Sequence, residues 1–142
     1  MTLLLNNVMK RAKTLFAVVL SAYLLGACAP SMTFQTSSVV PAATGNVKVK
    51  RDKNQNYVIS IDVQNLAPAD RLTPPQRTYI AWMESDRNTI KKLGLLESSS
   101  KSLKASLTTT AVNDPNRVFV TAESSPEIQY PGGTEVLATQ RR

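Results

Sequence analysis

The sequence predicts an all-β fold, namely an antiparallel β-sandwich of about seven strands over residues 47–142. Apolar residues recur at every second position in several segments, which is the period of a strand with one buried face. Short clusters of Asn, Asp, Pro and Gly separate these segments, and none of them shows the 3.6-residue period of a helix. Evenly spaced short strands are typical of a sandwich, although a partly open barrel has the same pattern.

The first two strands form a predicted β-hairpin. Valines alternate with lysines over residues 47–50, which indicates one buried and one exposed face. The polar run 52–56 consists of residues that favour turns. Apolar residues of one parity then occupy 57–63. The segment 66–76 contains three prolines and is expected to be a loop, because proline disfavours both helices and central strands.

Residues 77–85 form the most apolar segment of the domain. Tyr79 and Met83 have one parity, whereas Ile80 and Trp82 have the other. Two apolar faces predict either a central strand that is covered on both sides or a strand with one exposed aromatic face. Further strands are expected at 90–96, 103–109, 118–122 and 136–138, and Gly94 indicates a bulge or close packing in the first of these.

A secretory leader precedes the domain. Residues 10–13 carry three positive charges, and residues 14–27 are almost entirely apolar. This apolar run is shorter than the roughly 20 residues that a transmembrane helix needs, so a cleaved signal peptide over residues 1–27 is the better interpretation. Met9 directly precedes the basic residues and is preferred to Met1 as the translation start.

The small residues Gly26 and Ala27 stand directly before Cys28, the only cysteine. This arrangement resembles the lipobox of bacterial lipoproteins. The resemblance implies that Cys28 is acylated after removal of the leader and that its acyl chains are the membrane anchor, since two or more chains hold a protein firmly. By the same resemblance, Ala29 rather than Asp after the cysteine implies sorting to the outer membrane and not to the inner one. The alternative is a secreted protein with an unmodified cysteine.

Residues 28–46 are expected to be a flexible tether between the lipidated cysteine and the sandwich domain. The segment is rich in Pro, Ser, Thr and Ala. Such a composition buries too little apolar surface to offset the entropy of ordering the chain.

Composition excludes several functions. The leader accounts for three of the formal +7 charges, so the remaining chain carries +4, and we expect no nucleic-acid partner. The chain has no histidine, which is the commonest general base and transition-metal ligand, and we expect neither a cofactor nor a metal. With Cys28 acylated, no disulfide within the chain can form.

Residues 52–56 match the start of a calcium loop, with Asp52, Asn54 and Asn56 at the first, third and fifth positions. The glycine expected at the sixth position is Tyr57, and the glutamate expected at the twelfth is Val63. A hairpin turn is therefore the preferred interpretation.

Two other patterns also favour a structural interpretation. Residues 98–101 match the S-x-x-K motif of penicillin-recognising enzymes but lack the partner motifs. The carboxylate pairs Glu84 with Asp86 and Glu123 with Glu127 have the residue types of glycosidase acids, yet their places beside turns favour surface positions.

Trp82 is most simply a core residue, because it is a lone tryptophan on the expected central strand. If its face is exposed, Trp82 would form a stacking or partner-binding patch with Tyr79 or Tyr130.

From Tyr57 onward the order of apolar segments resembles the extracytoplasmic C-terminal domain of anti-sigma-K-type factors. The segments that carry the resemblance are 79–83, Leu93-Gly94, 118–123 and 130–133. The resemblance implies a β-sandwich and, by extension, a sensor or regulatory domain. The chain lacks the cytoplasmic sigma-binding segment and transmembrane helix of those factors. The whole chain also resembles small lipoproteins of the Bacteroidetes type, which implies a location in the cell envelope.

These observations lead to a first hypothesis of a non-enzymatic, lipid-anchored envelope protein whose sandwich binds a protein partner. A glycan- or peptidoglycan-binding lipoprotein is the second hypothesis, and a hydrolase is a distant third. A protein partner requires an exposed apolar edge or patch, whereas glycan binding requires aromatic side chains flanked by polar ones in a groove.

Overall fold

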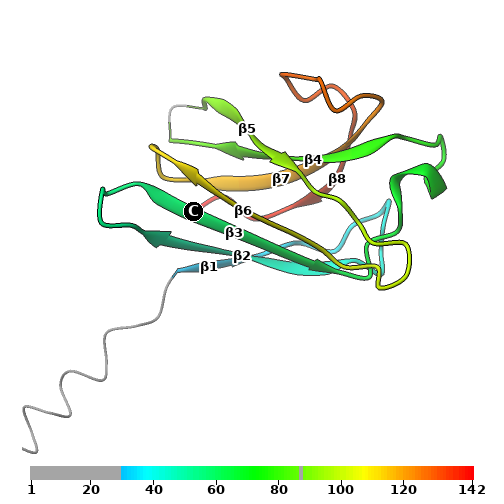
Figure 1. Cartoon of the computed structure of the whole chain (residues 1–142), viewed down its shortest axis with the longest axis horizontal. Coiled ribbons are helices and arrows are strands. Elements are labelled where there is room, and N and C mark those ends of the chain that lie inside the picture. Colours follow the sequence, from blue (N-terminus) through cyan, green and yellow to red (C-terminus); the bar gives the residue numbers. More distant parts are fainter. Residues whose placement is uncertain (1–29, 87) are drawn as a thin grey trace, which may run out of the picture.

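The computed structural model describes residues 30–86 and 88–142, so the predicted signal peptide and Cys28 lie outside the described residues. The described chain forms two four-stranded antiparallel sheets that pack face to face (Figure 1). The first sheet has the order β1-β2-β3-β6, with strands Ser31–Thr33, Thr44–Arg51, Tyr57–Gln64 and Ala105–Ala111. The second sheet has the order β5-β4-β7-β8, with strands Ile90–Leu95, Thr78–Glu84, Arg117–Glu123 and Thr134–Ala138. The predicted sandwich is confirmed, with eight strands among these residues instead of about seven.

The hairpin of β2 and β3 is confirmed. The two strands pair over their whole length, from Thr44 opposite Gln64 to Arg51 opposite Tyr57. The carboxylate of Asp52 closes the turn, because its Oδ1 accepts hydrogen bonds from the backbone N–H groups of residues 54 and 56 at 2.7 and 2.9 Å.

The main core lies between the sheets and follows the period-two pattern of the sequence. Its largest contributors from the first sheet are the side chains of one parity on β2 and β3, namely Val47, Val49, Ile59, Ile61 and Val63. The second sheet supplies Tyr79, Ala81, Met83, Val118, Val120, Ala122 and Leu137.

The central strands β4 and β7 are buried on both faces, which confirms one of the two alternatives for residues 77–85. On the face away from the first sheet, Ile80, Trp82 and Phe119 form a second apolar cluster, which we call the outer cluster. Ile128, from the loop 124–133, packs against this cluster. The ammonium group of Lys92 holds the loop by donating to the carbonyl oxygens of Pro126 and Ile128 at 2.6 and 2.9 Å.

Gly94 has both of the properties expected of it. A β-bulge shifts the register between β4 and β5 beside Gly94, whose φ is 152°. A Cβ atom at this position would lie 3.3 Å from the side chain of Leu107 on β6. The edges of the two sheets therefore approach each other closely at this point.

The predicted flexible tether over residues 28–46 is wrong from Ser31 on, because this segment belongs to the sandwich. β1 pairs with β2, and Met32 and Phe34 are buried in the main core together with Val40 and Ala43. The alternation of polar and apolar residues over 31–34 places both large side chains on the inner face. The domain therefore begins at residue 31 and not at residue 47.

The end of this first segment connects the two sheets. The backbone N–H of Phe34 donates to the carbonyl of Gly45 in the first sheet at 3.0 Å. The next residue, Gln35, donates to Ala138 of β8 in the second sheet at 2.8 Å, and Phe34 forms a bridge with Thr139. The sandwich is thereby closed along the edge that contains β1 and β8.

We expect the substitution Phe34→Ala to lower the free energy of unfolding by about 3 to 5 kcal/mol, because it leaves a cavity in the main core. The matched control is Thr33→Ala, since Thr33 directly precedes Phe34 and is exposed, so its loss should change stability by about 0.5 kcal/mol or less. Urea unfolding of the chain from Ala29 to Arg142 measures both values. Equal, negligible effects would show that the segment is a tether after all.

Candidate functional site

The predicted aromatic patch of Trp82, Tyr79 and Tyr130 does not exist. Trp82 has an exposed fraction of 0% and lies in the outer cluster, which confirms the interpretation of Trp82 as a core residue. Tyr79 is buried on the opposite face of β4, in the main core. Only Tyr130 is exposed, at 77%, on the loop 124–133. The patch prediction fails because alternate residues of a strand point to opposite faces and both faces of β4 are covered.

The polar atoms around Trp82 hold the loop 124–133 in place. The indole N–H of Trp82 donates to the hydroxyl of Thr121 at 2.8 Å, and this hydroxyl donates to Oε1 of Glu123 at 2.6 Å. The backbone N–H of Gly132 donates to the same carboxylate oxygen at 3.1 Å. The Glu123 carboxylate therefore ties β7 to the loop that covers the outer cluster.

Glu84 and Glu123 were expected at the surface, and both are buried, with exposed fractions of 5% and 2%. Glu84 forms an ion pair with Arg141 at 2.6 Å, so the C-terminal segment covers it. The two carboxylates lie at opposite ends of the sheet, since Glu84 is in register with Arg117 and Glu123 with Thr78. Each is engaged by its own donors, and they do not converge on one site. The sequence signal that indicates their face is parity within each strand, since Glu84 has the parity of Trp82 on β4 and Glu123 has the parity of Phe119 on β7.

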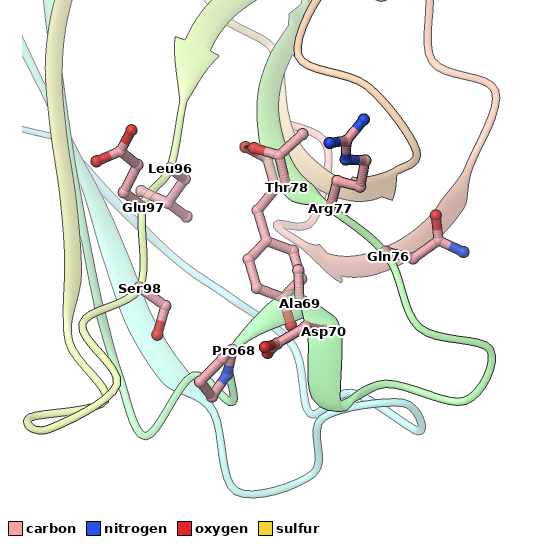
Figure 2. A pocket seen from close by; sticks show the side chains of 10 residues that line it. Pro68, Ala69, Asp70, Gln76, Arg77, Thr78, Leu96, Glu97 and Ser98 are labelled. Carbon is pink, nitrogen blue, oxygen red and sulfur yellow. Dashed lines mark hydrogen bonds between the residues drawn. The ribbon is translucent and has the colours of Figure 1, made fainter.

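A hollow of about 550 Å³ lies at the end of the sandwich remote from the start of β1, and we call it the distal hollow (Figure 2). The helical turn η2 (Ala69–Arg71) forms one wall. The start of β4 and the segment after β5 form the others. Its lining residues are Pro68, Ala69, Asp70, Gln76, Arg77, Thr78, Tyr79, Leu96, Glu97 and Ser98.

The hydroxyl groups of the distal hollow serve the fold. The Tyr79 hydroxyl donates to the carbonyl of Ala67 at 2.7 Å, and the Ser98 hydroxyl donates to the carbonyl of Leu66 at 2.6 Å. Both bonds hold the loop that follows β3 against the end of the second sheet. Residues 98–101 form a loop and turn, not the helix that the S-x-x-K mechanism requires.

Burial, together with the negative charge of Asp70, raises the pKa of the Tyr79 hydroxyl to about 12. The phenol is therefore a neutral hydrogen-bond donor throughout the physiological range. It holds the loop and does not serve as a general base.

Within residues 30–86 and 88–142, no group of three or more His, Cys, Asp or Glu side chains is placed to bind a metal ion. No helix in these same ranges is long and apolar enough to cross a membrane. Comparisons of the chain with protein-family models, with curated proteins and with solved structures found no match.

The raised pKa of Tyr79 gives a pH dependence of stability. The Tyr79 hydroxyl loses its proton near pH 10 in the unfolded chain and near pH 12 in the folded chain. The contribution of the protonated hydroxyl to the free energy of unfolding is therefore complete below pH 10 and is lost between about pH 10 and 12. Between pH 10 and 12, we expect the free energy of unfolding of the unaltered protein to fall by up to about 2.7 kcal/mol more than that of Tyr79→Phe, as measured by urea unfolding.

Ultraviolet titration of the folded chain should show one tyrosine that ionises near pH 12, and this step should be absent in Tyr79→Phe. Titration of every tyrosine near pH 10 would contradict the burial of Tyr79.

Proposed function

We propose that this chain is a non-enzymatic lipoprotein of the bacterial cell envelope, preferentially of the outer membrane, whose β-sandwich binds a protein partner. The observation that carries the proposal is the position of Cys28, which follows a basic segment, an apolar segment and the small residues Gly26 and Ala27. Acyl chains on Cys28 would be the membrane anchor.

The start of the fold supports cleavage before Cys28. Within residues 30–86 and 88–142, every strand of the two sheets lies at or after Ser31, so removal of residues 1–27 takes none of these strands. The sandwich then follows the acylated residue with only two residues, Ala29 and Pro30, between them.

Exposed apolar side chains support a protein partner. β5 is the last strand of its sheet, and Ile90 and Leu95 on it have exposed fractions of 40% and 36%. They are in register with Glu84 and Ile80, so both lie on the outer face of the second sheet. We call these two residues the apolar β5 face. Apolar groups on an edge strand are typical of sites that bind another protein.

The glycan-binding hypothesis loses its main support. Such a site needs aromatic side chains that stack on sugar rings, and both Trp82 and Tyr79 are buried. The distal hollow has polar side chains, but Tyr79 is its one aromatic lining residue, and the hydroxyl of that residue is bonded to Ala67. The chain also lacks histidine, and the hydroxyls of this hollow are engaged in the fold, which supports a non-enzymatic role.

The proposal is tested in cells with a photo-crosslinking amino acid at Leu95, in the natural sequence and in Cys28→Ala. We expect the natural sequence to incorporate labelled palmitate and to crosslink one discrete protein. Cys28→Ala should lose both the label and the crosslink, because it lacks the acyl chains that bring the domain to its partner.

The matched control carries the crosslinker at Ser106, which is exposed on the first sheet. Palmitate label retained in Cys28→Ala would overturn the anchor. The same capture from Ser106 as from Leu95, or capture of cell-wall fragments alone, would overturn the apolar β5 face as the partner site.

A further inference from the structure

Four positive charges gather at one corner of the sandwich, on the last residues of β2 and the turn that follows. Lys48, Lys50, Arg51 and Lys53 are all exposed, and we call them the basic corner. The one acidic residue among them, Asp52, has its carboxylate engaged by backbone N–H groups of the turn. No described residue forms an ion pair or a side-chain hydrogen bond with the ammonium groups of the three lysines. The three lysine charges are therefore free to meet a ligand, whereas the guanidinium of Arg51 donates to Gln55 and Tyr57 and lies over the Tyr57 ring.

The chain that comes from Cys28 enters the fold beside this corner. Ser31 of β1 is in register with Lys48 of β2. The carbonyl of Pro30 accepts a hydrogen bond from the backbone N–H of Val49 at 3.2 Å, between the two exposed lysines of β2. Figure 1 shows β1 and the tip of the β2–β3 hairpin at the same end of the sandwich.

The reach of the connecting residues is short. Three residue steps separate Cys28 from Ser31, which span at most about 11 Å at about 3.6 Å per residue. The Debye length in physiological salt is about 8 Å. If Cys28 is at the membrane surface, Ser31 lies at most about 1.4 Debye lengths from it, and Lys48 is the residue paired with Ser31. At such distances the attraction between the basic corner and negatively charged headgroups is only partly screened.

We propose that the basic corner binds anionic phospholipid headgroups in the leaflet that holds the acyl chains. This inference rests on the proposed acylation of Cys28. An acyl anchor and a nearby group of basic residues are two signals that act together, and the second of them also fixes the orientation of the domain.

The orientation has a consequence for the partner site. β2 runs from the distal end of the sandwich to the basic corner, and β3 returns, so the two ends of the sandwich are separated by the length of these strands. With the basic corner on the bilayer, the distal hollow points away from the membrane. Leu95 lies beside Leu96, which lines that hollow, so the end of the apolar β5 face that includes Leu95 is also remote from the headgroups.

The test uses the unacylated chain from Ala29 to Arg142, which contains all eight strands that the structure describes. The probes are vesicles of phosphatidylcholine with and without phosphatidylglycerol, and bound protein is measured by flotation. We expect binding only to vesicles that contain phosphatidylglycerol, and this binding should weaken as salt is added.

Lys48→Gln with Lys50→Gln should weaken this binding about 25-fold, because each basic residue near an anionic surface contributes about fivefold. The matched control is Lys101→Gln with Lys104→Gln, which removes the same charge from exposed positions at the distal end. It should bind as the unaltered chain does. An unchanged urea midpoint in both double variants verifies that they are folded, as expected because these lysine side chains make no contact that holds the fold.

Equal weakening in both double variants would overturn the proposal, because it would show a response to net charge alone. Binding to phosphatidylcholine alone, or to neither vesicle, would also overturn it. Because this chain carries no acyl group, the result is independent of palmitate labelling. A missing label with intact vesicle binding would refute the anchor, and a present label without vesicle binding would refute only the basic corner.

Discussion

Backbone pairing between the first and last segments of the described chain closes the sandwich along one edge. The N–H of Phe34 donates to the first sheet and the N–H of Gln35 to the second, so two neighbouring residues are hydrogen-bonded to different sheets. Thr139, opposite Phe34, reinforces this edge because its hydroxyl accepts a hydrogen bond from the N–H of Val118 at 3.0 Å. The pairing covers edges that would otherwise be open to other chains. It also places the entry of the chain beside the basic corner.

Much of the fold could be predicted because period-two alternation reflects one buried face. The segments 57–63 and 103–109 show the pattern clearly. The first lies in β3, inside the first sheet, and the second overlaps β6, at the edge of that sheet, from residue 105 on. β1 could not be recognised by composition, since its three residues lie in a Ser-, Thr- and Pro-rich stretch. The signal was present in the alternation of residues 31–34, but so short a strand is stable only through the neighbour it pairs with.

The site could be predicted less well, because parity assigns a face and does not say what covers it. Trp82 and Glu123 share the outer face of the second sheet, and the burial of both depends on a loop whose position the sequence pattern does not indicate. The buried state of Glu84 likewise depends on an ion pair with Arg141, more than fifty residues later in the chain. By contrast, Lys48 and Lys50 are exposed as the alternation predicts, and they lie next to the entry of the chain only because β1 exists.

The central claim is that the fold begins at Ser31, so that the sandwich follows Cys28 almost directly. Amide hydrogen exchange of the native chain tests this most directly, at the N–H groups of Phe34 and Gln35. Both donate to other strands, so they should be protected to a degree comparable with the amides of Ile59 and Ile61 in β3. Exchange of Phe34 and Gln35 at the rate of an unfolded peptide would contradict the claim and would restore a flexible tether.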